Sequence, residues 1–187
     1  MKQRNILIAG AGSAGTMMAN HLKRKLNHHE WKITIVDEAT THYYQPGFLF
    51  LPFGIYDEHE IQKPITKYIP DDVDFINTAI DKIEPERNVL TLINGAELPY
   101  DILIIASGCS IAPEETPGMK DKLWYKDIFD FYSFDGAKAL HDKLKNWEGG
   151  RLAIHITEMP IKCPVAPLEF AFLADDFFKH KGMRDEV

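Results

Sequence analysis

The chain has 187 residues, of which 45% are hydrophobic and 26% are charged, and its formal net charge is −7. These values are typical of a globular protein and exclude an intrinsically disordered chain or a collagen-like fibre. The acidic balance, and the lack of a basic run interleaved with aromatic residues, argue against a nucleic-acid surface. No apolar stretch reaches the roughly 18 residues of a membrane-spanning helix.

The two cysteines and the histidines do not have the spacing of a disulfide framework or a metal site. Cys109 and Cys163 lie far apart in the chain, so we expect free thiols in a reducing compartment and no bound metal. The basic residues before the first apolar run imitate a secretory signal. The glycines that follow favour a buried strand instead, which keeps this end of the chain cytosolic.

The predicted elements begin with a strand at 4–9, a helix at 13–29 and a second strand at 32–36. Residues 42–70 are irregular and rich in aromatic residues and proline, which is typical of a long ordered loop with a function. Further strands are predicted at 73–77, 79–84, 88–93, 97–99 and 101–106, followed by a helix at 134–147, a strand at 151–157 and a helix from about 164 to 180.

The first candidate site is the segment Gly10-Ala11-Gly12-Ser13-Ala14-Gly15, which has the spacing G-x-G-x-x-G between a strand and a helix. In this context the first glycine permits a tight turn, the second lets the backbone approach a pyrophosphate, and the third allows the helix to pack closely. Asp37 follows about 20 residues later, where an acid can accept the ribose hydroxyls, and Glu38 lies beside it. The pattern predicts a dinucleotide site but does not by itself separate FAD from NAD.

The meander of short strands and the buried strand that ends in Ile105-Ala106-Ser107-Gly108 resemble the FAD domain of flavoprotein reductases with two dinucleotide domains. In that family the corresponding segment usually ends in Ala-Thr-Gly, so Ser107 is a mild departure that keeps the hydroxyl. We therefore expect an α/β fold: a Rossmann-like FAD-binding domain with a β-meander, followed by the first strand and helix of a second dinucleotide-type domain.

The second candidate site is a cysteine where a nicotinamide-binding motif would stand. The segment from Glu158 to Glu169 contains no glycine and three prolines, which disfavours a phosphate-binding turn. Cys163 precedes Pro164, so we expect it near the N-cap of the last helix, where the helix dipole and Lys162 favour the thiolate. A buried structural cysteine is an equal alternative on these grounds.

The segment Ile161-Lys162-Cys163-Pro164-Val165-Ala166-Pro167-Leu168-Glu169 resembles the redox-cysteine motif of sulfide:quinone oxidoreductases. The resemblance also covers the glycine motif, Tyr44-Gln45-Pro46-Gly47 and Ile105-Ala106-Ser107-Gly108. It implies an FAD enzyme in which Cys163 accepts the sulfur of sulfide as persulfide or polysulfide and quinone takes the electrons from the flavin.

The same resemblance assigns roles to four further residues. Gln45 and Pro46 match a segment beside the flavin, and Ile80 matches a position whose backbone meets the adenine side. Glu169 matches an acid near the redox site and is a candidate proton acceptor, although an acid in a first helical turn is also ordinary. Cys109 is interpreted as structural rather than as the partner cysteine.

We expect three regions: an FAD-binding domain at 1–112, a connection and linking helix at 113–148, and the start of a second domain at 149–187. In the family the partner cysteine and the membrane-docking helices lie downstream of the matching segment. We therefore expect a truncated chain that is inactive alone, with Phe170, Phe172, Leu173, Phe177 and Phe178 exposed or covered by a partner.

The resemblance places the parent protein in the cytoplasm or peripherally on the cytoplasmic membrane, reaching the membrane surface only through its missing C-terminal part. A homo-oligomer is left open. The alternatives are an NADH:quinone reductase of the same fold and a non-catalytic flavin-binding module.

Overall fold

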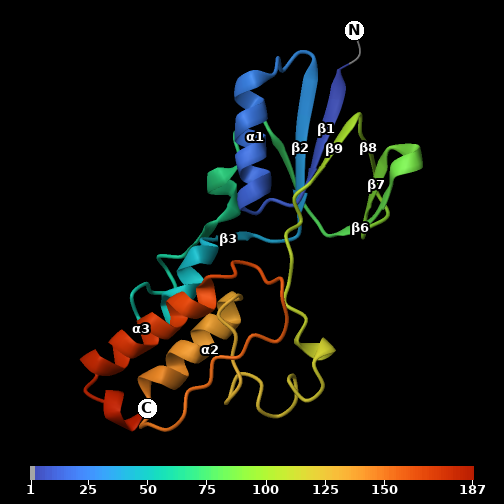
Figure 1. The fold of residues 1–187 in the computed structure, drawn as a ribbon. Helices are drawn as coiled ribbons and strands as arrows, with labels where there is room; N and C mark the ends of the chain where they lie inside the picture. Colours follow the sequence, from blue (N-terminus) through green and yellow to red (C-terminus); the bar gives the residue numbers. More distant parts are fainter. Residues whose placement is uncertain (1–2) are drawn as a thin grey trace. The chain divides into compact units, whose positions relative to one another are not determined.

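The computed structural model describes residues 3–187, which form two compact units. Unit 1 consists of residues up to Tyr43 together with Gln62–Cys109, and unit 2 consists of Tyr44–Ile61 together with Ser110–Val187. Figure 1 shows the strands in unit 1 and two of the three α-helices in unit 2. The domain boundaries expected from the sequence stay a prediction.

Unit 1 is built on a parallel sheet of four strands with the order β5-β2-β1-β9. The strands are β1 (Arg4–Ala9), β2 (Trp31–Asp37), β5 (Asp74–Asn77) and β9 (Ile102–Ile105). Because β1 pairs in parallel with both β2 and β9, the carboxyl ends of these three strands meet at one edge of the sheet. This edge is where ligands bind in open α/β sheets.

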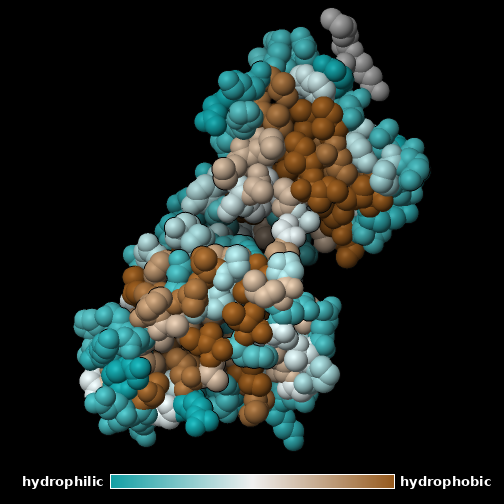
Figure 2. Space-filling model, viewed as in Figure 1, coloured by the Kyte–Doolittle hydropathy of each residue, from teal (hydrophilic) through white to brown (hydrophobic). Residues whose placement is uncertain are grey.

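Helix α1 (Ser13–Lys25) follows β1 and packs on this sheet. Its buried Ala19 joins the buried Ile6, Ile8 and Ile35 of the strands in one apolar cluster. The helix is shorter than the predicted 13–29, because Leu26 has an extended backbone and a turn follows it. Figure 2 shows apolar side chains gathered over the sheet of unit 1, where Ile102 and Ile105 of β9 are exposed.

The remaining strands of unit 1 form two small antiparallel sheets. The meander is β6 (Ile80–Glu84), β7 (Val89–Leu92) and β8 (Glu97–Pro99), as predicted, and its buried Leu90 and Leu92 pack with Leu7 and Val36. The pair β3 (Thr41–Tyr43) and β4 (Gln62–Pro64) falls, apart from Thr41, in the stretch 42–70, which is therefore not irregular throughout as predicted.

Unit 2 contains helices α2 (Phe134–Lys145) and α3 (Ala166–His180) and the 3-10 helices η1 (Gln45–Leu49) and η2 (Leu51–Phe53). Ser133 caps α2 by accepting a hydrogen bond from the N–H of Gly136 at 3.1 Å. The core combines Leu49 and Phe53 with side chains of α2 and α3, and the rings of Phe53 and Phe170 lie 5.0 Å apart.

Two expectations for unit 2 are wrong. Residues 151–157 form no strand: a strand is held by hydrogen bonds to a neighbouring strand, and unit 2, all of which is described, contains none. Phe170 and Phe178 are buried in the core of unit 2 rather than exposed, because η2 and α2 cover them. Phe172, on the opposite side of α3, is 75% exposed as expected.

The two-residue N-terminus, Met1 and Lys2, lies outside the described residues. Within residues 3–187, every helix falls short of the length and apolar character that a bilayer crossing requires.

Candidate functional site

The glycine turn of unit 1 has the geometry that its spacing predicts. Gly10 has a φ of +106°, and a Cβ atom there would collide with the backbone at Ala106 and Ser107. A Cβ on Gly15 would collide with the carbonyl oxygen of Gly10. These two glycines therefore let the chain turn tightly and let α1 start directly against the strand ends.

Gly12 differs from the other two glycines because open space surrounds it. A Cβ at this position would meet nothing within 4 Å. Gly12 is the N-cap of α1, no side chain caps the helix there, and its first turn holds no acidic residue. Ser13 and Ala14 are exposed, so their N–H groups, which have no acceptor within a helix, are open to an anion.

The carboxylate of Asp37 lies beside this turn, at the end of β2. One oxygen accepts a hydrogen bond from the N–H of Ala11 at 2.6 Å, and the other accepts one from the N–H of Ala39 at 2.8 Å. A carboxylate has about four acceptor sites, so the two oxygens keep capacity for ribose hydroxyls. Glu38 is exposed and follows directly.

Ser107 and Gly108 lie at the same edge of the sheet, because the N–H of Ala106 donates to the carbonyl oxygen of Ala9 at 2.7 Å. Both residues are exposed, and Gly108 has a φ of +71°. Ile80 begins β6 opposite Leu92 and is half-buried. The structure thus brings the glycine turn, Asp37, Ser107 and Gly108 to one edge, and Ile80 to the adjoining meander.

Asn77 is a residue at this edge that the sequence analysis missed. Its side-chain amide donates to the carbonyl oxygens of Asp37, Glu38 and Ala39 at 2.9–3.1 Å. These bonds fix the backbone that carries the Asp37 carboxylate. The available signal was a polar residue at the carboxyl end of the strand predicted at 73–77.

The other predicted residues belong to unit 2. Gln45 and Pro46 are exposed and begin η1. Lys162 donates a hydrogen bond from Nζ to the side-chain oxygen of Gln45, which brings the Cys163 loop to this turn. Glu169 is exposed in the first turn of α3.

Cys163 is exposed, so the alternative of a buried structural cysteine is wrong. Its predicted place near the N-cap is displaced by two residues, because α3 is capped by Val165 and has Pro167, not Pro164, in its first turn. The carbonyl oxygen of Cys163 accepts the N–H of Ala166 at 3.1 Å, and Cys163 has a φ of +53°. Cys109 is also exposed, in unit 1.

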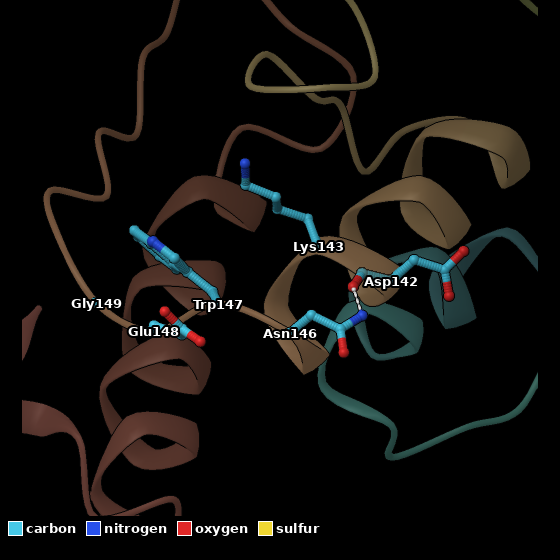
Figure 3. A pocket seen from close by; sticks show the side chains of 6 residues that line it. All are labelled: Asp142, Lys143, Asn146, Trp147, Glu148 and Gly149. Atoms are coloured by element: carbon cyan, nitrogen blue, oxygen red, sulfur yellow. Dashed lines mark hydrogen bonds between the residues drawn. The ribbon is translucent and has the colours of Figure 1, made fainter.

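One hollow of about 520 Å³ lies at the end of α2. Figure 3 shows its side chains spreading apart rather than converging; the hydrogen bond drawn there runs from the side-chain amide of Asn146 to the carbonyl oxygen of Asp142. A ligand pocket needs a few convergent polar groups, so we assign no function to it. Among residues 3–187, no cluster of three or more His, Cys, Asp or Glu side chains could hold a metal ion.

The edge of the parallel sheet fits the phosphates and one ribose of a dinucleotide. The fit rests on the space beside Gly12, where a side chain would stand in the way, and on the free donors of a helix end without a competing acid. The nearby carboxylate of Asp37 complements a sugar hydroxyl rather than a phosphate.

Residues 4–154 match the family model described as pyridine nucleotide-disulphide oxidoreductase. The chain is 28% identical over 183 residues, 97% of its length, to the mitochondrial sulfide:quinone oxidoreductase of Dictyostelium discoideum. It is 29% identical over 154 residues, 80% of its length, to the type II NADH:quinone oxidoreductase of Staphylococcus haemolyticus. It spans 40% and 37% of these two proteins.

The fold is similar to that of the sulfide:quinone oxidoreductase from Aquifex aeolicus, with a TM-score of 0.76 and 22% sequence identity. The alignment covers 98% of this chain and 42% of that structure. These values confirm the predicted Rossmann-like α/β fold.

Proposed function

The chain belongs to the pyridine nucleotide-disulphide oxidoreductase family, an oxidoreductase family of flavoproteins, and we propose that it is part of a flavoenzyme that oxidises sulfide with a quinone as acceptor. The observation that carries the proposal is the exposed Cys163 in a segment without glycine, where a nicotinamide-binding turn would be needed. The similarity to sulfide:quinone oxidoreductases over nearly the whole chain supports it.

We propose that unit 1 binds FAD at the edge of its parallel sheet. The N–H groups at the start of α1 would hold the pyrophosphate, and the Asp37 carboxylate would accept the ribose hydroxyls. Ser107 and Gly108 would line the same edge, and Ile80 would meet the adenine side. Gln45 and Pro46 would lie beside the flavin.

In the proposed reaction Cys163 accepts the sulfur of sulfide. A cysteine thiolate and hydrosulfide are both nucleophiles, so joining their sulfur atoms as a persulfide releases one electron pair and one proton and requires an acceptor for the pair. When bound, FAD would supply the two-electron acceptor that this oxidation needs, and the quinone would be the final acceptor of the pair. Glu169 would accept a proton released from the sulfide. Because a quinone dissolves in lipid, we propose that the whole protein works peripherally on the cytoplasmic membrane.

Oxidation of NADH by a quinone is the second candidate function. The similarity to a type II NADH:quinone oxidoreductase over 80% of the chain favours it. The three prolines of residues 158–169 argue against it, because they restrict the backbone where a second phosphate-binding turn is needed.

Anaerobic reduction of the flavin distinguishes the two functions, and it is measured on the complete gene product. Sulfide and NADH are added separately while the visible flavin absorbance is followed, in wild type, Cys163→Ser and Cys109→Ser. We expect sulfide to bleach wild type and Cys109→Ser but not Cys163→Ser, and NADH to bleach none of them. Bleaching of all three proteins by NADH, and of none by sulfide, would overturn the proposal.

A further inference from the structure

The segment that carries Cys163 lacks regular secondary structure. Residues 157–162 precede a short turn, and α3 starts only at Ala166. Cys163 itself adopts the left-handed conformation, which is unfavourable for a residue with a Cβ atom. Such a conformation persists where surrounding contacts hold it, and this often happens at functional sites.

Gln45 and Tyr132, from two other parts of unit 2, each form one hydrogen bond with this segment. Lys162, the neighbour of Cys163, donates a hydrogen bond to Gln45 in the 3-10 helix η1. Tyr132 donates a hydrogen bond from its hydroxyl to the carbonyl oxygen of Cys163 at 3.4 Å. The first contact anchors the side chain of the residue before Cys163, and the second holds the carbonyl oxygen of Cys163 itself. Together they restrict the segment on both sides of the Cys163 α-carbon.

Tyr132 is itself held in place before α2. Its N–H donates to the carboxylate of Asp130 at 2.9 Å, and its ring stacks on Phe131 with the centroids 5.0 Å apart. Burial raises the pKa of the Tyr132 hydroxyl above its usual value, and the negative charge of a Cys163 thiolate raises the pKa further. The hydroxyl therefore keeps its proton at neutral pH and acts as a donor, and it is close enough to Cys163 to respond to its charge.

We propose that Lys162 and Tyr132 are positioning residues that hold Cys163 in its left-handed conformation just before α3, Lys162 by its bond to Gln45 and Tyr132 by its bond to the Cys163 carbonyl. The inference rests on the proposed function, because that function gives Cys163 its role as sulfur acceptor. Neither side chain needs to touch the substrate. Each acts by restricting where the sulfur atom lies.

The test is the rate at which iodoacetamide alkylates Cys163, measured by mass spectrometry of peptides from the full chain. Cys109 is exposed and belongs to unit 1, so its rate in the same sample is an internal control. The variants are Lys162→Met, Lys162→Arg, Gln45→Ala and Tyr132→Phe. Lys162→Met removes the charge and the donor, whereas Gln45→Ala removes only the acceptor and leaves the lysine charge.

We expect Lys162→Met, Gln45→Ala and Tyr132→Phe each to lower the ratio of the Cys163 rate to the Cys109 rate at least threefold. The physical reason is that the thiol is exposed while the segment is held, and a released segment no longer keeps it in that accessible position. Lys162→Arg keeps a donor and should stay within twofold of wild type. If Gln45→Ala leaves the ratio unchanged while Lys162→Met lowers it, Lys162 acts through its charge alone and the inference is wrong. Unchanged ratios in all variants, or equal loss in Lys162→Arg, also contradict it.

A second measurement tests the Tyr132 contact through ionisation rather than reactivity. In protein with carbon-13-labelled tyrosine rings, the Tyr132 signal is assigned from Tyr132→Phe and followed with rising pH. Cys163→Ser removes the thiolate charge, so we expect the pKa of Tyr132 to fall toward its usual value. An unchanged pKa would place Cys163 too far away for the proposed contact. Neither measurement uses sulfide, so the positioning role and the proposed function can fail separately. If sulfide reduces the flavin but the alkylation ratios do not change as expected, the positioning role is refuted and the proposed function stands.

Discussion

Replacing Gly12 by alanine separates cofactor binding from folding at the glycine turn. The new Cβ meets nothing within 4 Å, and the backbone of Gly12, with φ −68° and ψ −166°, suits alanine. Alanine loses less chain entropy on folding, by about 0.4–1 kcal/mol, but is a worse N-cap than glycine by about 0.5–1 kcal/mol. These contributions offset each other, so the free energy of unfolding should stay within about 1 kcal/mol of wild type.

FAD binding should respond very differently to the same substitution. The methyl group would occupy the space that the pyrophosphate needs to reach the N–H groups of α1. We expect affinity for FAD to fall at least tenfold, which corresponds to about 1.4 kcal/mol. Fluorescence titration of FAD with the protein, beside urea unfolding without FAD, measures both quantities.

Gly15→Ala is the matched control for this experiment. Its Cβ collides with the carbonyl oxygen of Gly10, so the backbone must shift, and we expect a loss of stability of about 1–3 kcal/mol. The reasoning is refuted if Gly12→Ala binds FAD within twofold of wild type, because the pyrophosphate would then lie elsewhere. A loss of stability of more than 2 kcal/mol in Gly12→Ala, on the order of the overpacking cost, would show that its surroundings are not open.

Three predictions concern unit 2. Phe178→Ala removes a ring that is 1% exposed and should lower the free energy of unfolding, measured with urea, by about 3–5 kcal/mol. Phe172→Ala, at a 75% exposed position, should change the same free energy by less than about 0.5 kcal/mol. Equal losses in the two variants would contradict the described core. Ser133→Ala removes the cap of α2 and should cost about 1 kcal/mol in the same assay, and no loss would mean that the cap is dispensable. The hydrogen bond from Lys138 lowers the pKa of Glu58. The pair therefore stabilises the folded protein fully above the usual pKa of a glutamate, and this stabilisation is lost as pH falls through the lowered pKa of Glu58. The stability difference between wild type and Glu58→Gln should therefore shrink from pH 7 to pH 3, and a constant difference would argue against this pair.

The first strand, helix and second strand were predictable because local signals agree there. Apolar runs, a glycine motif and a β-branched strand all indicate the same βαβ unit, and the structure forms it with α1 four residues shorter than expected. The glycine roles follow from stereochemistry, which does not depend on distant contacts. This consistency between levels explains why the βαβ unit forms where the pattern predicts it, with Asp37 at the end of β2.

The segment 151–157 shows the limit of local pattern. Its residues alternate as in a strand, but a strand also requires a hydrogen-bonding neighbour, and sequence pattern does not reveal whether one is present. The start of α3 was misplaced for a different reason. Pro164 and Pro167 both suit the first turn of a helix, and packing of Phe170 and Phe178 in the core decides which one lies there.

The bond between Lys162 and Gln45 could not be predicted at all. Its residues are 117 positions apart, and both are exposed polar side chains of ordinary type. Only the packing of η1 and α3 into one unit brings them together.

The interleaved course of the chain has a consequence for synthesis on the ribosome. Residues 44–61 leave unit 1 and join unit 2, whose other residues follow only after position 109. At a synthesis rate of about 5–20 residues per second, several seconds pass between the synthesis of Leu49 and Phe53 and that of α2 and α3. During this time the apolar side chains of Leu49 and Phe53 lack their packing partners. A nascent chain stalled near residue 109 would thus display this segment as a target for chaperones.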